Sequence, residues 1–422
     1  MQILCTSLAE NDGIGPKSRD LSKKMASGVP IDVQARLVQK EEEEEERGLT
    51  VLFWNVENFF DWRNDSTTVS DVEFSAAGER HWTWKRFQAK ANAFAKAVFW
   101  TEAETGRLPD IIGLEEVENA FVLRQVLQKT ALRKLDYQYV HYDSPDHRGI
   151  DVALLYRSSR LELLDSKSCH LYAADTVMAT RDILLCVFQR ARTSIISAPP
   201  STVQPDPLSS VQPASLSTVV PDPDRASIAT FQEIPGQAGN DGAFAVLVNH
   251  HPSKYGGAAE SEPRRRIAVE RLRFLADSLG AVGIDRIIAG GDFNDTPDNP
   301  VFGLLEPVLV PMHMDLYRRG LGTIKFDGKW DLIDHIYVSP ALVAVPMSGS
   351  TSDSFPVKVD RQTDKVGVPS ARARMQILRI PFLLTRDTVH SGEKPLRTYT
   401  GPRHTGGVSD HLPVLLEVPL PP

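Results

Sequence analysis

Residues 290–297 read Gly290-Gly291-Asp292-Phe293-Asn294-Asp295-Thr296-Pro297 and follow the apolar run Arg286-Ile287-Ile288-Ala289. A short apolar run bounded by glycines predicts a buried strand, and two glycines at its end allow close approach of the backbone. Side chains two residues apart in an extended segment point the same way, so Asp292 and Asn294 could contact one ligand. Asp, Asn, Gly and Pro are also ordinary turn residues, so an Asx-rich turn is the alternative interpretation.

Other predicted strands deliver polar side chains in the same way. A strand from Leu49 leads into Asn55, and the strand Asp110–Leu114 leads into Glu115 and Glu116. Further polar groups follow or precede the strands Ala243–Val248, His335–Val338 and Leu412–Val418; they are His250, Asp334, Asp410 and His411. Strands are also predicted over Tyr137–Tyr142, Asp151–Arg157 and Arg181–Arg190.

Amphipathic helices alternate with these strands. From Trp84, apolar residues recur at helical spacing until Gly106 and Pro109, and a second helix carries Leu123, Val126 and Leu127 inward. A third helix is predicted from Pro263 to Leu279. Strands alternating with helices indicate an α/β protein.

Charge is concentrated in one segment. The chain of 422 residues has a net charge of −8, and Glu41 to Glu46 form a run of six negatives, without which the remainder carries −2. Like charges repel, so residues 1–48 are predicted to be a disordered acidic tail. A nearly neutral body is not the footprint of a protein that binds nucleic acid by charge alone, although a bound cation could still supply positive charge for a phosphate substrate.

Two segments interrupt the alternation. Residues 191–242 contain eight prolines among Ser, Thr and Ala, and are predicted to be a disordered insertion within a loop. Residues from about 347 to 370 form a second irregular insertion rich in Ser, Asp and Lys. Residues 49–420 are therefore expected to form a single domain.

Cellular location follows only from what the sequence lacks. We see no secretory signal at Met1–Cys5 and no apolar run near the roughly 20 residues that cross a bilayer. Three cysteines, Cys5, Cys169 and Cys186, have no metal-ligand spacing and cannot all pair. These features favour a cytoplasmic protein without membrane insertion, and no stable protein partner is predicted.

Imidazoles together with carboxylates and carboxamides suit hydrolysis of a phosphate ester with Mg²⁺ or Mn²⁺. Hard cations prefer oxygen ligands, often one or two carboxylates plus water. The metal neutralises the phosphoryl oxygens, a carboxylate activates water, and a histidine stabilises or protonates the departing charge.

The same motifs resemble the endonuclease/exonuclease/phosphatase superfamily, which includes deoxyribonuclease I, from about Leu49 to Val418. Trp54 to Asp61 and Arg397 to His411 are especially similar to a bacterial endonuclease-like branch. The resemblance implies a four-layer α/β/β/α sandwich of two mixed sheets flanked by helices, as one catalytic domain.

The resemblance also implies roles for individual positions. Glu116 and Asp410 would bind the metal, with Glu115 as a neighbour that could be mistaken for the ligand. The implied catalytic residues are His250 (with adjacent His251 as the alternative position), Asp292, Asn294, Asp334 and His411, where Asp334 orients His411. Asn55 would contact the phosphate or support the site, and basic side chains expected near a phosphate are Arg148, Lys254 and Arg265.

These residues predict a divalent-metal-dependent phosphodiesterase, most simply a nuclease with DNA or RNA as its substrate. The nearest alternative is a phosphatase or phospholipase of the same fold acting on a small phosphorylated molecule or a lipid head group. A catalytically silent binding module is the alternative of another class. Hydrolysis of plasmid, single-stranded DNA, RNA and simple phosphate esters discriminates between them.

Overall fold

Side chains of strand β1 (Leu49–Phe59) alternate between two hydrophobic cores, because successive residues of a strand point to opposite faces. Val51 and Phe53 belong to the core between two sheets, whereas Leu52 and Trp54 belong to the core beneath a layer of helices. One strand therefore shows that the protein is layered. A third core lies on the far side of the second sheet.

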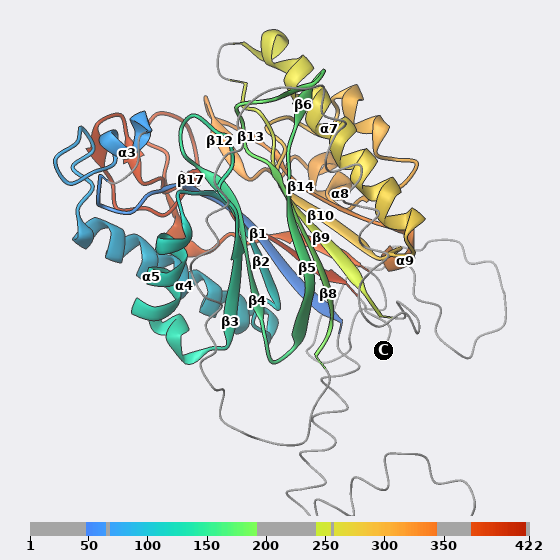
Figure 1. Cartoon of the computed structure of the whole chain (residues 1–422). Helices are drawn as coiled ribbons and strands as arrows, with labels where there is room; N and C mark the ends of the chain where they lie inside the picture. The colour runs from blue at the N-terminus through green and yellow to red at the C-terminus, as the bar shows by residue number, and fades with distance from the viewer. Residues whose placement is uncertain (1–47, 65–67, 192–241, 255–256, 344–372, 419–422) are drawn as a thin grey trace, which may run out of the picture. The chain divides into compact units, whose positions relative to one another are not determined.

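The computed structural model describes residues 48–64, 68–191, 242–254, 257–343 and 373–418 (Figure 1). From Leu49 onward these residues form one compact unit. The acidic tail, the Pro-rich insertion and the second irregular insertion lie outside the described residues, apart from end residues 48, 191 and 242. Those three predictions stay predictions.

Two six-stranded sheets form the centre of the fold. The first has the order β15-β20-β1-β2-β4-β3, and the second has the order β11-β14-β10-β9-β8-β5. Each contains one parallel pair, β1 with β2 and β9 with β10, and antiparallel neighbours on both sides. Besides β1, the strands are β2 (Ile111–Val117), β3 (Tyr137–His141), β4 (Asp151–Arg157), β5 (Leu161–Cys169), β8 (Ile183–Arg190), β9 (Phe244–His250), β10 (Ile287–Asp292), β11 (Val310–Pro311), β14 (Asp334–Val338), β15 (Arg374–Ile377) and β20 (Val414–Val418).

Helices cover the outer faces of both sheets, as Figure 1 shows. Helices α4 (Trp84–Thr105) and α5 (Ala120–Lys129) pack on the first sheet, and α7 (Ala258–Ala281) packs on the second. The sequence-based expectation of a four-layer α/β/β/α sandwich is confirmed. Shorter helices are α3 (Val69–Glu73), η2 (Ala131–Lys134), η4 (Pro300–Leu304), α8 (Met314–Arg318), α9 (Pro340–Val343) and η5 (Pro381–Leu383).

Four small hairpins complete the described structure. They pair β6 (Tyr172–Ala173) with β7 (Thr176–Val177), β12 (Ile324–Phe326) with β13 (Lys329–Asp331), β16 (Leu384–Arg386) with β17 (Glu393–Pro395), and β18 (Tyr399–Thr400) with β19 (Arg403–His404).

Helix α4 follows its sequence pattern closely. Phe87, Phe94 and Val98 are fully buried, and the helix ends at Gly106, which caps it in the left-handed conformation with φ 74°. Helix α7 was predicted too short, since it begins at Ala258 and contains Pro263. A proline is favoured in the first helical turn, which is why the pattern placed the start there.

The sequence-based prediction was wrong about where β10 ends, and it did not include β5. Gly290 and Gly291 do not end their strand, because both pair with β9 and β14 and the strand runs on to Asp292. Strand β5 was not predicted. Its sequence is largely polar and half-buried, as suits an edge strand, and it lacks the apolar pattern that marked the others.

The glycines of β2 and β10 make room for a phenylalanine between the sheets. A Cβ added at Gly113 would lie 2.5 Å from the ring of Phe53, and one at Gly290 would lie 2.4 Å from the same ring. Phe53 is buried in the core between the sheets. The close packing of one ring against two glycine backbones thus fixes how the sheets sit at this level.

We expect Gly290→Ala to destabilise the protein by about 1–3 kcal/mol, because overpacking a filled core displaces side chains and backbone. Equilibrium unfolding in urea measures the change. Phe53→Leu in the same chain should recover part of the loss by vacating space for the new methyl group. If Gly290→Ala alone leaves the unfolding midpoint unchanged, Phe53 does not fill this gap.

Candidate active site

Three of the predicted site residues lie in one row across the second sheet. The register of β10 with its neighbours places Asp292 opposite His250 on β9 and opposite Asp334 on β14. All three residues are buried. Polar groups that the sequence places after separate apolar runs are therefore brought together by strand pairing.

Asn55 connects this row to the first sheet. Its Nδ2 donates a hydrogen bond to Oδ2 of Asp292 at 3.0 Å, and its Oδ1 accepts from the N–H of Glu57 at 2.9 Å. Because Asn55 is 2% exposed and both ends of its amide are engaged, it holds the Asp292 carboxylate in place.

His411 lies against Asp334 and near Asp292. Its Nδ1 is 2.9 Å from Oδ2 of Asp334, and its Nε2 is 3.9 Å from Oδ2 of Asp292. Its carbonyl oxygen accepts from Nε1 of Trp54 at 3.0 Å, which fixes the backbone here. A carboxylate only accepts hydrogen bonds, so Nδ1 carries the hydrogen and Nε2 faces Asp292.

The two histidines of the site have opposite electrostatic surroundings. Burial alone would lower the pKa of His411, but Asp334 and then Asp292 and Asp410 raise that pKa well above the ordinary value. Burial lowers the pKa of His250 well below the ordinary value, and nearby arginines add to the effect. At neutral pH His411 is therefore a cation and His250 is neutral.

The carboxyl group of Asp292 also has a shifted pKa. Burial raises its pKa to about 7; His411 opposes this shift, and Asp334 adds to it. Nε2 of His250 lies 3.6 Å from its Oδ2. A carboxylate whose pKa is near the working pH is suited to accept a proton from water.

His250 and His251 differ in what they face. The ring of His251 is fully buried and packs on Phe293, with ring centroids 4.4 Å apart. Its carbonyl oxygen accepts from Nδ2 of Asn294 at 3.0 Å. His250 is thus the histidine beside Asp292, and His251 supports the turn that follows β10.

Asn294 does not share the extended geometry expected from its spacing to Asp292. Strand β10 ends at Asp292, and Asn294 adopts a left-handed conformation with φ 52°. Its backbone N–H donates to Oδ1 of Asp292 at 2.8 Å. The Asx-turn interpretation is therefore correct for the backbone here, and the turn itself orients the Asp292 carboxylate.

Glu116, a predicted metal ligand, is held at the end of β2. It has a left-handed φ of 65°, and its carboxylate accepts from the N–H of Asn58 at 2.7 Å and pairs with Arg148 at 3.4 Å. Burial alone would raise the pKa of Glu116, but Arg148 and the Asn58 N–H lower it below the ordinary value. The carboxylate is therefore ionised.

Asp410, the other predicted ligand, pairs with Arg397 at 2.8 Å. Both predicted ligands are carboxylates, the donors that Mg²⁺ and Mn²⁺ prefer, and both have their charge balanced by an arginine. This pair of carboxylates fits a hard divalent cation. When bound, the cation would balance their negative charge together with, or in place of, Arg148 and Arg397.

Within the described residues, one group of potential ligands has atoms all within 4.8 Å of one another, and it was not predicted: His141, Asp143 and Asp151. Oδ1 of Asp151 accepts from the hydroxyl and N–H of Ser144, and Oδ2 lies 3.0 Å from Nε2 of His141. These hydrogen bonds already satisfy Asp151, so we assign no cation to this group.

Glu115 is buried beside the site but apart from the predicted ligands. It is fully buried, and neither carboxylate oxygen has a hydrogen-bond partner among the described residues. Burial, followed by the nearby Asp334 and Asp292, raises its pKa well above the ordinary value. Glu115 thus carries a proton where Glu116 does not.

We expect Glu115→Gln to stabilise the metal-free protein at neutral pH. A carboxyl group with a raised pKa in the folded state costs stability as pH rises above its unfolded value of 4.5, and glutamine removes that cost. Thermal melts in EDTA should show a higher Tm for the variant at neutral pH and equal values near or below pH 4.5. A variant that is less stable than the wild type at neutral pH, and equally stable near or below pH 4.5, would show instead that the ionised carboxylate stabilises the fold.

Lys254 and Arg265 both pair with Asp295 in the described structure. Nζ of Lys254 lies 2.6 Å and Nε of Arg265 lies 3.1 Å from this carboxylate. Arg265 is 2% exposed and supports the turn from within, whereas Lys254 is exposed. Of these two residues predicted to lie near a phosphate, Lys254 is the one with an exposed side chain.

The sequence analysis missed two arginines at the site. Arg181 is buried, pairs with Asp146 at 2.9 Å and donates to the carbonyl of His251 at 2.7 Å. Arg397 links Glu57 to Asp410. An arginine directly before an apolar strand was the available signal for Arg181, and Arg397 lay within a motif that was recognised without assigning its side chain.

Layers of two mixed sheets with polar strand ends meeting between them define an α/β-sandwich of the deoxyribonuclease I-like class. The chain belongs to the Endonuclease/Exonuclease/phosphatase family, which it matches over residues 50–196 and 211–419. Members of this family are hydrolases that include nucleases and phosphatases, and they generally use divalent metals.

Solved structures with a similar fold come from bacteria and animals. A family protein from Bacteroides thetaiotaomicron is 16% identical, covering 89% of this chain and 98% of its own, with a TM-score of 0.46. A mannosyl-6-phosphatase from the same species is 14% identical (88% and 99% covered, TM-score 0.44). The catalytic domain of human Nocturnin with bound sulfate is also 14% identical (88% and 94% covered, TM-score 0.44). No curated protein matches the chain.

The helices that the structure describes bear on membrane insertion. None of them combines the length and apolar character required to span a bilayer.

Proposed function

We propose that this protein is a divalent-metal-dependent phosphodiesterase that hydrolyses nucleic acid. The observation that carries the proposal is the meeting of Asn55, His250, Asp292, Asp334 and His411 at the ends of strands from both sheets. In one buried place, this arrangement combines the carboxyl group of Asp292, whose pKa is about 7, with the charged imidazole of His411 and the neutral imidazole of His250.

Asp292 is proposed to orient the attacking water and take its proton. Asn55 and the turn at Asn294 hold its two oxygens, which fixes the direction of the remaining lone pairs. Water then forms the new P–O bond while the bond to the leaving oxygen breaks. The proton passes to Asp292, which can accept it near neutral pH.

His411 is proposed to stabilise the charge that builds on phosphorus-bound oxygens, since it stays cationic beside Asp334. His250 is neutral and can donate one hydrogen bond to the same group or to the leaving oxygen. Glu116 and Asp410 would hold Mg²⁺ or Mn²⁺, which when bound neutralises phosphoryl oxygens as a Lewis acid.

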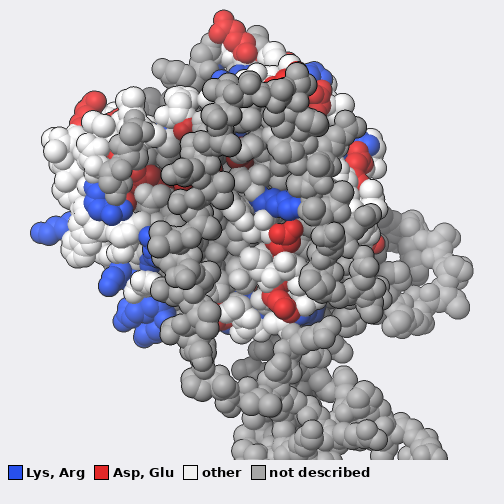
Figure 2. All heavy atoms as spheres, viewed as in Figure 1, with Lys and Arg blue, Asp and Glu red and all other residues white. Residues whose placement is uncertain are grey.

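Charge on the body does not by itself select the substrate. In the view of Figure 2, acidic and basic side chains are mixed, and basic ones gather on the side where α4 and α5 lie in Figure 1. Exposed residues of this region include Lys85, Arg124, Lys129, Arg133 and Lys134.

The test is a panel of substrates with Mg²⁺ or Mn²⁺: supercoiled plasmid, single-stranded DNA, RNA, a sugar phosphate and a phospholipid. We expect cleavage of nucleic acid that is lost in Asp292→Asn and kept in the exposed control Asp285→Asn. Turnover of only the sugar phosphate or the lipid would replace nuclease by phosphatase or phospholipase. No turnover of any member would leave a binding module.

A further inference from the structure

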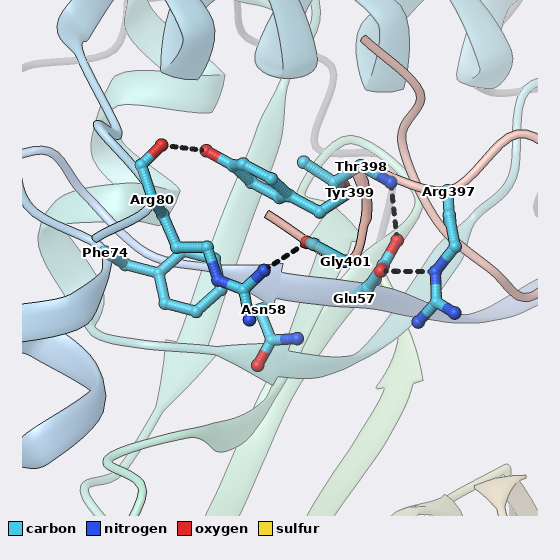
Figure 3. A pocket seen from close by; sticks show the side chains of 8 residues that line it. All are labelled: Glu57, Asn58, Phe74, Arg80, Arg397, Thr398, Tyr399 and Gly401. Carbon is cyan, nitrogen blue, oxygen red and sulfur yellow. Dashed lines mark hydrogen bonds and ion pairs between the residues drawn. The ribbon is translucent and has the colours of Figure 1, made fainter. Parts of the chain in front are cut away.

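A pocket of about 160 Å³ lies beside the candidate active site, where the end of β1 meets the segment before β18 (Figure 3). The pocket touches the candidate site through Glu57, Asn58 and Arg397, but the side chains that line it have no role in the proposed reaction. Its lining consists of Glu57, Asn58, Phe74, Arg80, Arg397, Thr398, Tyr399 and Gly401.

Three side chains of the pocket retain unused donors. Arg80 donates from Nε to Glu73 and from Nη1 to the carbonyl of Gly401, each at 2.6 Å, and Nη2 has no partner among the described residues. Arg397 uses Nε and Nη2, which leaves Nη1 similarly unpaired in the described structure. Oδ1 of Asn58 accepts from Arg148 at 2.9 Å, so the other end of its amide is a donor.

Two acceptors of the pocket, the Glu57 carboxylate and the Gly401 carbonyl, in contrast already accept hydrogen bonds from protein groups. Both carboxylate oxygens of Glu57 accept hydrogen bonds, one from Nε of Arg397 at 3.2 Å and one from the N–H of Thr398 at 2.7 Å. The carbonyl of Gly401 accepts from Arg80. A ligand entering here meets donors, so it must bring acceptor oxygens, which is the chemistry of an anion.

Aromatic rings hold the Arg80 guanidinium in place. Its central carbon lies 5.7 Å from the ring centroid of Phe74 and 5.2 Å from that of Tyr399. Figure 3 shows this guanidinium between Phe74 and Gly401, close to the side chain of Asn58. A guanidinium held by two cation–π contacts and two hydrogen bonds loses little freedom when it binds an anion.

The pocket adjoins both predicted metal ligands. The N–H of Asn58 donates to Glu116 at 2.7 Å, and Nη2 of Arg397 donates to Asp410 at 2.8 Å. Residues that line the pocket therefore also contact both carboxylates that would hold the metal, so an anion in the pocket would be a neighbour of a phosphate on that metal. A chain molecule with phosphates at successive positions meets this requirement, whereas an isolated monophosphate does not.

We propose that the pocket of Arg80, Asn58 and Arg397 binds the phosphate next to the scissile one in a nucleic-acid strand. The inference rests on the proposed nuclease function and specifies how the strand is held. Arg80 is the residue to test, because Arg397 also contacts Asp410 and Asn58 also contacts Glu116.

The experiment measures binding of a trinucleoside with two linkages by calorimetry with Mg²⁺, and every protein, including the one with wild-type Arg80, carries Asp292→Asn to prevent turnover. The same molecule with either linkage replaced by a neutral methylphosphonate has equal size and one charge fewer. We expect the wild type to bind the doubly charged molecule about tenfold more tightly, as suits a charge-assisted contact. Arg80→Met should abolish that preference, and Arg80→Lys should keep part of it.

Arg273→Met is the matched control. Like Arg80, Arg273 pairs through Nε with one carboxylate, at 2.7 Å, and donates from Nη1 to one backbone carbonyl, at 2.8 Å, but it lies on α7. It should keep the charge preference. Absence of a preference in the wild type, or the same loss in Arg273→Met as in Arg80→Met, overturns the proposal, and thermal melts exclude misfolding.

Failure of the proposed function gives a different result. If charge-dependent binding is seen and is lost in Arg80→Met, but no nucleic acid is hydrolysed with Mg²⁺ or Mn²⁺, the pocket is supported and the nuclease activity is wrong. If nucleic acid is hydrolysed but the linkage charge does not affect binding, the nuclease stands and the pocket assignment falls.

Discussion

Exhaustive chelation of divalent cations should abolish hydrolysis by this protein, and added Mg²⁺ or Mn²⁺ should restore it. The reason is the ligand set: Glu116 and Asp410 offer carboxylate oxygens, and no cysteine belongs to the site. Without a cation, the ionised Glu116 also repels the phosphate group. Initial rates are measured after dialysis against EDTA and then during titration with each metal.

A variant of Glu116 shows whether EDTA acts by removing a cation from Glu116 or by an effect elsewhere in the protein. Glu116→Gln keeps the shape of the side chain but loses its charge, so half-maximal activity should require at least about tenfold more metal. Glu104→Gln on the exposed face of α4 is the control and should titrate like the wild type. Full activity after chelation, with trace metal excluded, would refute this site.

The layers of the fold were predictable because each depends on local pattern. Phe87 and Val98 on α4 recur at helical spacing, and Ile287 and Ile288 form an apolar run, so burial could be inferred before any contact was known. Strand β5 lacked such a signal. It is a strand because it pairs with β8, and the pattern of its own residues does not indicate this pairing.

The candidate site was predictable as a set of strand-end residues but not as a geometry. Strand pairing places Asp292 between His250 and Asp334, and only the contact between sheets brings Asn55 to it. Arg265 was predicted to lie near a phosphate, but its side chain is buried against Asp295. Composition shows which side chains are present and cannot show which way they point.

Residues with a strained backbone also cluster at the candidate site. Glu57, Asn58, Glu116 and Asn294 all have φ between 48° and 65°, a region that costs energy for residues with a side chain. Each of them lies at or just beyond the end of a central strand and contacts another site residue. Sequence alone gave no sign of this, because none of the four is glycine.

Loss of the Asp334–His411 pair should reduce turnover by about 10²–10⁴-fold, the usual contribution of a positioned acid–base group. Asp334→Asn keeps the shape but removes the charge that raises the pKa of His411. The imidazolium is then lost at a lower pH, so the alkaline limb of the pH–rate profile should move to lower pH. His411→Ala should be at least as damaging, and steady-state rates against pH measure all three proteins.

The double variant decides whether the two residues act together. Residues that work as one unit are not additive, so Asp334→Asn with His411→Ala should be little slower than His411→Ala alone. The exposed residues His390 and Asp327 are 3.4 Å apart and serve as a matched control. The same two single substitutions and the double substitution at this pair should leave turnover unchanged. If Asp334 only begins strand β14 and His411 only neighbours Asp410, each substitution would change turnover by a few-fold at most and the losses would multiply. Melting curves must show that all variants fold, because the contact between Nδ1 of His411 and Asp334 also connects the segment before β20 to strand β14.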